Sequence, residues 1–486
     1  MLRVAGESGS INIVRKGDQI ILPKGMSNHA AVAWIIQQDI AENSPVKIDH
    51  TINCMPLDGV NALWQCIKTT FGHVEFMRTA ATMFKPSEPP TMLSIPTGVS
   101  GEFIQTPFCR MRIPALDGGW LMATASVGFG GIRLIGEVKK KHEQRVKELL
   151  ASISTFLTTH SIYRGKALML DHEFLDLLEQ DISHFDLMKH APSFLDVKSA
   201  TRENVILNEE TEFDLNTSIF LRIQNPEACI ANNMPLKHGA VFSGTFGTGK
   251  TSTGYLIANI AQKHGWTFIY CKDNDRIVEA LNLAKMYPRV VVFFEDVDSV
   301  LSGERDDDMN AVFEAMDGID AKTNHVISIF TTNNEKAIHP GFMRAGRIET
   351  LLRFHKPDAA AARKFVSKFA RTKDGNDTVL AGDVDMEIVG EALKGLAPAE
   401  LFEIVGLGKA SALLRAGGTH NITGKVKTSD IIAAAASKRA RIALTEERTP
   451  LTKGRAVVNA LALVESAKYP DFDPEAQHHW NGTAAS

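Results

Sequence analysis

The pattern of apolar and polar residues changes period along the chain. In residues 1–135, helical and alternating patterns are mixed. Ser27 is placed to cap a helix that continues to Ile40, residues 56–72 favour a second helix, and residues 108–113 alternate like a half-buried strand. Helical spacing then predicts an amphipathic helix over 137–158, a strand over 162–170 and an acidic helix over 174–182. We expect a mixed α/β N-terminal domain over 1–135 and a helix-and-strand connector over 136–204.

From residue 240 onward, short apolar runs alternate with helical patterns. Such runs between helices are typical of buried strands in a parallel sheet, which predicts a doubly wound α/β domain over 205–355. The runs lie at 241–242, 267–270, 290–294, 326–330 and 348–354. Three helical patterns, at 358–371, 398–414 and 429–444, predict an all-α unit over 356–444. A last helical pattern at 457–467 and a polar tail fill residues 445–486.

Composition narrows the class of protein. The 486 residues are 44% hydrophobic and 23% charged, with a formal net charge of −4, which is ordinary for a soluble chain and gives no reason to expect a nucleic-acid partner. No apolar stretch reaches the roughly 20 residues that span a bilayer, and residues 1–12 lack a signal-peptide core. The five cysteines are scattered, which predicts free thiols and no zinc site. We therefore expect a cytoplasmic protein.

The sharpest motif is the run G-T-F-G-T-G-K-T at residues 244–251. It follows a predicted strand and opens a predicted helix, the context in which glycines turn backbone N–H groups toward phosphate oxygens at a helix N-terminus. Lys250 would reach the β- and γ-phosphates, and the Thr251 hydroxyl would bind Mg²⁺. The residues predicted to bind ATP are Gly244, Thr245, Phe246, Gly247, Thr248, Gly249, Lys250, Thr251 and Ser252.

A second motif places Glu295 and Asp296 directly after the buried run at 290–294. The carboxyl ends of parallel strands meet at one edge of a sheet, so these acids should lie beside the phosphate loop. A third stretch carries Asn333 after the run at 326–330, and then His339-Pro340 and the R-A-G-R sequence that begins at Arg344 and ends at Arg347.

Together these stretches resemble the AAA family of ATPases, in the clade with the second region of homology, over residues 205–440. The resemblance implies that one acid holds Mg²⁺ with Thr251 and the other polarises the attacking water. In the family the first acid is usually Asp and the second is usually Glu. In this chain Glu295 comes before Asp296, so the assignment of the two roles stays open, although Glu295 occupies the metal position. Asn333 would position the water.

The resemblance also implies partners. Arg344 and Arg347 would reach the site of a neighbouring subunit as arginine fingers, which implies a homo-oligomer, expected to be a hexameric ring. His339 stands where the family usually has aspartate. The segment from Gly395 to Leu401 is similar to the G-x-x-G-A-D-L segment of the family's helical lid.

The chain departs from protein-threading relatives between Cys271 and Val290. This stretch predicts one helix over 275–285 and contains a single aromatic residue, Tyr287, so an aromatic pore loop is not expected. We expect an ATP-hydrolysing, chaperone-like ring motor that remodels a protein client recognised by residues 1–200. Two alternatives remain open: a nucleotide-gated scaffold with little turnover, and a DNA-directed loader or initiator.

Overall fold

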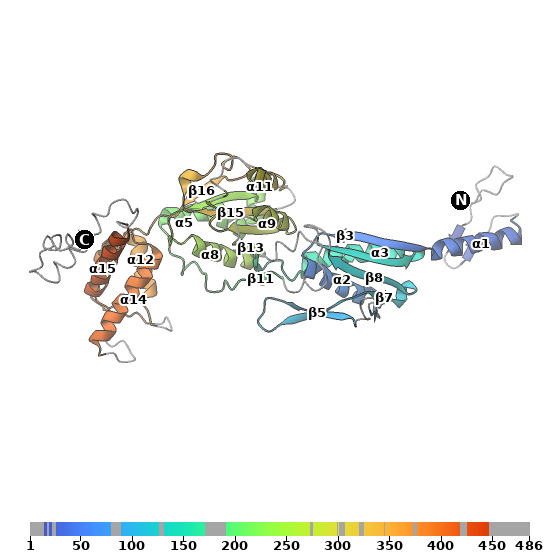
Figure 1. Cartoon of the computed structure of the whole chain (residues 1–486), viewed down its shortest axis with the longest axis horizontal. Helices are drawn as coiled ribbons and strands as arrows, with labels where there is room; N and C mark the ends of the chain where they lie inside the picture. The colour runs from blue at the N-terminus through green and yellow to red at the C-terminus, as the bar shows by residue number, and fades with distance from the viewer. Residues whose placement is uncertain are drawn as a thin grey trace, which may run out of the picture.

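Three bodies lie in a row in the computed structural model (Figure 1). An N-terminal α/β body is followed by a central α/β body and then by a helical body. The structure describes residues 14–16, 19–21, 26–78, 89–125, 131–170, 191–272, 276–298, 300, 307–319, 325–344, 346–372, 377–417 and 425–446. The helices predicted at 174–182 and 457–467 lie outside these residues.

The N-terminal body is built on an antiparallel sheet with strand order β3-β9-β8-β7-β4. Helices α2 and α3 pack on each other and share its hydrophobic core. Ser27 caps α1, as predicted, by accepting a hydrogen bond from the Ala30 N–H at 3.2 Å. The elements are β1 (Val14–Lys16), β2 (Gln19–Ile21), α1 (Asn28–Asn43), β3 (Pro45–Ile52), α2 (Pro56–Phe71), β4 (Glu75–Phe76), β5 (Thr91–Pro96), β6 (Phe103–Phe108), β7 (Met111–Ile113), η1 (Pro114–Leu116), β8 (Gly119–Ala125), β9 (Ile132–Lys139), η2 (Lys140–His142) and α3 (Glu143–His160).

The central body holds a seven-stranded sheet in the order β11-β10-β13-β14-β15-β12-β16, and only β11 runs antiparallel to its neighbour. Its apolar strands send alternate side chains into two cores, so both faces are covered and the predicted α/β class is confirmed. The elements are β10 (Ala167–Leu170), β11 (Ser193–Phe194), α5 (Glu209–Leu215), η3 (Asn216–Phe220), α6 (Leu221–Gln224), α7 (Pro226–Ala231), β12 (His238–Ser243), α8 (Lys250–Lys263), β13 (Thr267–Cys271), α9 (Ile277–Ala284), β14 (Arg289–Phe294), α11 (Asp307–Asp317), β15 (His325–Thr332), η4 (Glu335–Ala337) and β16 (Thr350–Arg353).

The segment over 136–204, for which the sequence predicts a connector, divides between the two sheets. Residues 132–139 pair with β3 and β8, so the amphipathic helix begins at Glu143 and not at residue 137. Further along, β10 pairs in parallel with β13 and β11 pairs with β10, which extends the central sheet. Strand pairing overrides the helical period because backbone groups at the sheet edge need partners.

The helical body contains α12 (Ala359–Phe369), α13 (Met386–Leu393), α14 (Pro398–Arg415) and α15 (Thr428–Glu446) around a core of its own. The sequence predicted all but α13, which Asp385 caps through the N–H groups of Glu387 and Ile388. The start of α14 faces the phosphate loop: a Cβ placed on Gly247 would lie 3.7 Å from the Cβ of Ala397.

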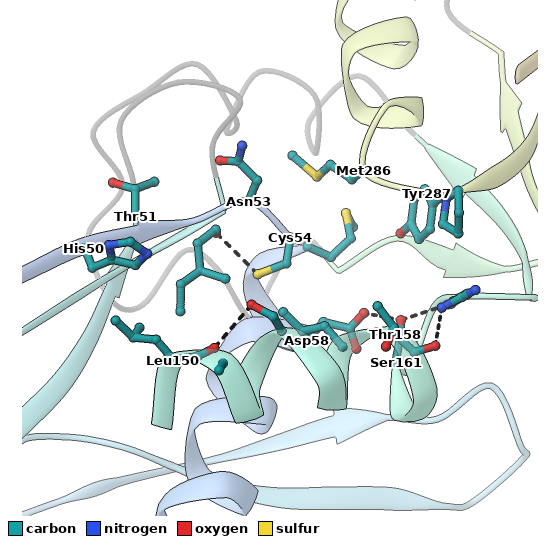
Figure 2. Close-up of a pocket in the computed structure, with 17 residues that line it drawn as sticks. His50, Thr51, Asn53, Cys54, Asp58, Leu150, Thr158, Ser161, Met286 and Tyr287 are labelled. Atoms are coloured by element: carbon teal, nitrogen blue, oxygen red, sulfur yellow. Dashed lines mark hydrogen bonds between the residues drawn. The ribbon is translucent and has the colours of Figure 1, made fainter. Parts of the chain in front are cut away.

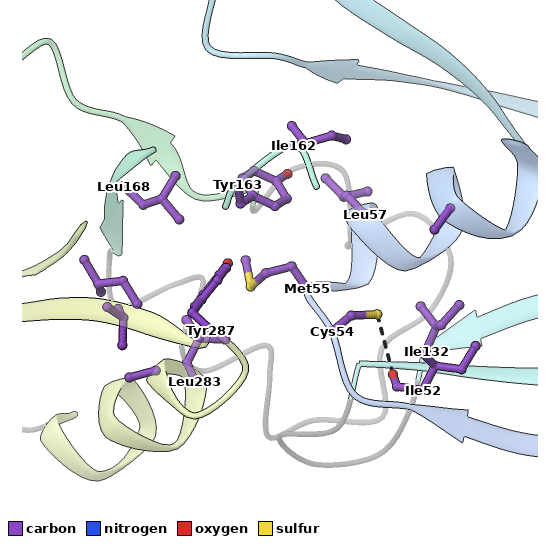
Figure 3. Close-up of a cluster of buried hydrophobic side chains, with 14 of the residues drawn as sticks. Ile52, Cys54, Met55, Leu57, Ile132, Ile162, Tyr163, Leu168, Leu283 and Tyr287 are labelled. Carbon is purple, nitrogen blue, oxygen red and sulfur yellow. Dashed lines mark hydrogen bonds between the residues drawn. The ribbon is translucent and has the colours of Figure 1, made fainter. Parts of the chain in front are cut away.

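The N-terminal and central bodies share one hydrophobic core. Figure 3 shows Met55 and Tyr163 beside Leu283 and Tyr287, which come from the end of α9 and the turn before β14. Asp58 anchors this junction by accepting hydrogen bonds from the Ser161 hydroxyl and, at 2.6 Å, from the Ile162 N–H. Its burial raises the pKa of the Asp58 carboxyl to about 6.

A cavity of about 450 Å³ opens at the same junction (Figure 2). Its lining comes from the β3–α2 turn, from α3 and from the residues before β14, among them Asn53, Thr158, Met286 and Tyr287. The hydroxyls of Tyr163 and Tyr287 are buried and have no hydrogen-bond partner among the described residues. The junction therefore combines a shared apolar core with buried polar groups and a cavity.

All five cysteines are buried free thiols, as the sequence predicts. Among the described residues, no helix has the length and apolar character needed to cross a membrane.

Candidate nucleotide-binding site

The phosphate loop joins β12 to α8 and depends on its glycines. Gly247 and Gly249 have φ values of 75° and 100°, in the left-handed region that other residues rarely adopt. A Cβ on Gly244 would lie 2.5 Å from the carbonyl oxygen of Phe354. The backbone therefore turns at the helix N-terminus in the way a phosphate cradle requires.

Lys250 is the first residue of α8, and its ammonium group is folded into the loop. The Nζ atom donates to the carbonyl oxygens of Gly244 at 2.5 Å and Thr245 at 3.3 Å, and to Oδ1 of Asn333 at 2.9 Å. Burial lowers the pKa of Lys250, and the charges of Asp296, Asp298 and Glu295 oppose that shift. These three oxygen atoms accept hydrogen bonds from the ammonium group, and phosphate oxygens could replace them as acceptors.

Glu295 and Asp296 follow β14 but contact different partners. The Glu295 carboxylate accepts hydrogen bonds from the Thr251 hydroxyl and the Tyr270 hydroxyl. Oδ1 of Asp296 accepts from Nδ2 of Asn333 at 3.1 Å. The longer acid therefore sits at the start of α8, and the shorter acid sits with the amide that follows β15.

The backbone accounts for this separation. Asp296 has a φ of 49°, a conformation in which Asp and Asn are enriched among residues other than glycine. Its N–H donates to Oγ1 of Thr331 at 2.8 Å, which ties the bend after β14 to the neighbouring strand β15. Because this bend turns the chain between the two acids, their side chains leave the strand toward different partners.

Asn333 is held by a third acid that the sequence reading did not assign. Oδ1 of Asp298 accepts from the Asn333 N–H at 3.0 Å, and Oδ2 accepts from Nδ2 at 3.2 Å. Burial opposes ionisation of Asp298, but hydrogen bonds from Thr332 and Asn333 outweigh it and lower the pKa of the carboxyl. Its position two residues after Asp296 is the only signal of this role in the sequence.

Tyr270, the second residue missed from the sequence, lies on β13 and is 5% exposed. It reads as an ordinary apolar strand residue, because nothing near it in the chain indicates that its hydroxyl meets Glu295.

Arg347 is engaged within its own chain. Its guanidinium makes two hydrogen bonds to Asp317, at 3.0 and 2.6 Å, donates to the Gly341 carbonyl oxygen at 2.9 Å and lies 4.0 Å over the Phe313 ring. Arg344 is exposed and makes no hydrogen bond to any described residue. The pair therefore divides into one arginine that braces the turn and one whose side chain faces solvent.

His339 stands where the family usually has aspartate, and its ring makes a turn contact that a carboxylate could also make. Nδ1 accepts a hydrogen bond from the Gly341 N–H at 3.0 Å, two residues along the chain. An aspartate in this position commonly accepts the same kind of bond. The departure from the family pattern therefore preserves the local turn.

The structure brings the phosphate loop, Glu295, Asp296 and Asn333 to one edge of the central sheet, at the ends of β12, β14 and β15. In the described residues, no hydrogen bond joins Arg344 or Arg347 to this group. Thr251 and Glu295 present hard oxygen donors next to the loop, the ligand type that Mg²⁺ prefers.

Comparison with known proteins supports the same interpretation. The model of the family described as "ATPase family associated with various cellular activities (AAA)" matches residues 240–356. The chain is 25% identical over 272 residues to ATP-dependent zinc metalloprotease FtsH 3 of Petrotoga mobilis, covering 52% of this chain and 39% of that protein. It is 25% identical over 312 residues to FtsH of Rubrobacter xylanophilus, covering 58% and 43%.

A third relative, FtsH 1 of Sphaerobacter thermophilus, is 26% identical over 279 residues, covering 52% of this chain and 40% of that protein. The chain therefore spans about two fifths of the length of these relatives. Residues 240–356, within the central body that brings the loop, acids and amide to one sheet edge, therefore form an ATPase domain of the AAA type.

Proposed function

We propose that this chain hydrolyses ATP as a subunit of a ring and uses the energy to remodel a protein partner. The observation that carries the proposal is the contact of Lys250, Asp296 and Asp298 with one side chain, Asn333, beside the phosphate loop. A γ-phosphate on Lys250 would lie next to this amide and carboxylate. That is where an attacking water has to be held.

Within this site we assign the two acids by their partners. Glu295 belongs to the metal side, because its carboxylate meets the Thr251 hydroxyl that opens α8. Asp296 belongs to the water side, because it meets Asn333. Bound Mg²⁺ would neutralise developing charge on the β- and γ-phosphate oxygens. Lys250 and the loop N–H groups hold the phosphates, while Asp296 and Asn333 orient the water and the Asp296 carboxylate accepts its proton.

We assign the trans contact to Arg344. Its guanidinium is exposed, whereas that of Arg347 is held by Asp317 and the Gly341 carbonyl. In this arrangement Arg347 fixes the turn from which Arg344 reaches the neighbouring subunit's phosphates. A finger of this kind contributes roughly 10³–10⁵ in turnover. We expect a homo-oligomeric ring, hexameric by resemblance, since an arginine that acts in trans has no role in a monomer.

The partner-recognition step falls to the N-terminal body. The stretch between β13 and β14 contains α9, whose partners lie in the core shared with that body, and its one aromatic residue, Tyr287, is buried there. These contacts do not support an aromatic threading loop, so we assign contact with the protein partner to the N-terminal body. The relatives' names describe ATP dependence and zinc proteolysis, and we carry over only the first.

Steady-state ATPase activity across protein concentration tests the proposal, beside Lys250→Ala, Asp296→Asn and Arg344→Ala. We expect turnover per subunit to rise with concentration. Lys250→Ala should lose nucleotide binding, whereas Asp296→Asn and Arg344→Ala should bind nucleotide and lose turnover. Normal turnover in Arg344→Ala at every concentration would contradict the trans assignment.

A nucleotide-gated scaffold is the second candidate, and the order of the acids favours it. Asp296 is one methylene shorter than the glutamate usual at the water position, so its carboxylate reaches less far toward a γ-phosphate. If ATP drives oligomerisation while wild type and Asp296→Asn show the same negligible turnover with and without protein partners, the scaffold reading replaces the motor.

A further inference from the structure

Tyr270 contacts the metal-side acid from a neighbouring strand. It lies on β13 opposite Phe293 of β14, two residues before Glu295. Its hydroxyl donates to Oε2 of Glu295, while Oε1 accepts from Thr251. Each oxygen of one carboxylate is therefore held by a separate hydroxyl, one from the sheet and one from the start of α8.

Packing fixes the phenol ring of Tyr270. The ring stacks on Phe293 with centroids 5.8 Å apart and an interplanar angle of 14°, and it lies 5.9 Å from the ring of Tyr255 on α8. Only 5% of the residue is exposed. A hydroxyl on a ring held this firmly has little freedom to follow a moving partner, so it defines where the Glu295 carboxylate rests.

A glutamate at this position needs such a contact more than an aspartate would. Its side chain has one more rotatable bond, so its carboxylate lies farther from the backbone and samples more positions. Two hydroxyls that bind opposite oxygens remove that freedom. The hydrogen bond from Thr251 alone would fix one carboxylate oxygen of Glu295 and leave the carboxylate free to rotate about that oxygen.

We propose that Tyr270 is a positioning residue for Mg²⁺: it holds the Glu295 carboxylate where the metal–nucleotide complex requires it and so compensates for the extra methylene of glutamate. The inference rests on the proposed assignment of Glu295 to the metal side. Groups that orient metal ligands in this indirect way commonly change metal affinity about 10- to 100-fold when they are removed.

The test is the Mg²⁺ dependence of nucleotide binding by the full chain. Binding of a fluorescent ATP analogue is titrated with Mg²⁺ in an Asp296→Asn background, so that hydrolysis does not interfere. Tyr270→Phe should raise the half-saturating Mg²⁺ concentration about 10-fold, and binding in EDTA should not change. Tyr287→Phe is the matched control, since it removes a buried hydroxyl that has no partner among the described residues.

A second arm separates positioning from general loss of packing. The shorter side chain in Glu295→Asp should not reach the Tyr270 hydroxyl, so adding Tyr270→Phe to Glu295→Asp should cause no further change in Mg²⁺ dependence. In the single variant Tyr270→Phe, which keeps both Glu295 and Asp296, excess Mg²⁺ should restore most of the ATP turnover.

The outcomes are distinct. If the Asp296→Asn chain binds nucleotide with Mg²⁺ dependence and adding Tyr270→Phe leaves the half-saturating Mg²⁺ concentration unchanged within twofold, the positioning role is overturned and the proposed ATPase stands. If Tyr270→Phe and Glu295→Asp act additively, the hydroxyl works independently of Glu295, and the inference is again wrong. If neither wild type nor the Asp296→Asn chain shows Mg²⁺-dependent nucleotide binding, both the inference and the proposed function fail.

Discussion

Removal of one oxygen atom at the junction is expected to stabilise the chain. Tyr287 is 4% exposed, and its hydroxyl is buried without a hydrogen-bond partner among the described residues. Unfolding returns this hydroxyl to water, so burial without a partner costs roughly 1–3 kcal/mol in the folded chain. The ring itself belongs to the core shared by the two bodies and would remain in Tyr287→Phe.

We therefore expect Tyr287→Phe to raise the free energy of unfolding by about 1 kcal/mol, the low end of that range. In a unit of 150–250 residues this corresponds to a rise in Tm of about 2–4 °C. Tyr287→Ala, which also removes the ring, should lower the free energy of unfolding by about 3–5 kcal/mol. Tyr270→Phe provides a contrast, since its hydroxyl donates to Glu295, and its loss should cost about 1 kcal/mol.

Urea unfolding followed by tryptophan fluorescence measures both bodies, because Trp120 lies on β8 and Trp266 is buried beside β13. Equal slopes for the three variants would show that only stability has changed. A loss of 0.5 kcal/mol or more in Tyr287→Phe would refute the reasoning, because it would mean that the hydroxyl makes a favourable contact in the folded chain.

Three further predictions concern other parts of the chain. Asp58→Asn should remove a pH dependence of the free energy of unfolding. The carboxyl has a pKa of about 6 in the folded chain and near 3.9 in the unfolded chain, so its contribution to stability falls as pH rises between these values, by up to about 3 kcal/mol. Unfolding at pH 4.5 and 7.5 should therefore show wild type losing stability relative to Asp58→Asn. Gly254→Ala should destabilise α8 by about 1 kcal/mol and weaken nucleotide binding, because the new Cβ would lie 2.7 Å from the Phe293 ring. An unchanged Tm and unchanged nucleotide affinity would show that the ring can shift to make room. Asp385→Ala should cost about 1 kcal/mol through loss of the α13 cap, whereas Asp385→Asn should retain most of it, as thermal unfolding can check.

The central sheet could be predicted because its strands are apolar on both faces, and the phosphate loop because its glycines are required by local geometry. The start of a helix at Glu143 could not be predicted, because the apolar residues in 132–139 suit either a strand or a helix. Only the pairing of this segment with β3 shows that it is a strand. The role of Tyr270 could not be predicted from the sequence for a related reason. Its hydroxyl acts across strands, on a residue 25 positions away, and no local pattern marks such a contact.

The arginine pair shows a different limit. The sequence places Arg344 and Arg347 equally well for action in trans, and the local motif contains nothing to separate them. The structure separates them through Asp317 and Phe313, which lie on α11, about thirty residues earlier in the chain. Residue type and spacing therefore predicted the candidates, and tertiary contacts distinguish the surroundings of the two side chains.

The two strands that extend the central sheet determine how the chain can be shortened. A fragment that begins at residue 205 would keep the whole phosphate loop but would leave β13 as an edge with unpaired backbone groups, and it would open the apolar core that the two bodies share. Such a fragment should aggregate. The N-terminal body is thus no interchangeable module, and any exchange of this body between relatives would have to leave β10 and β11 with the central sheet.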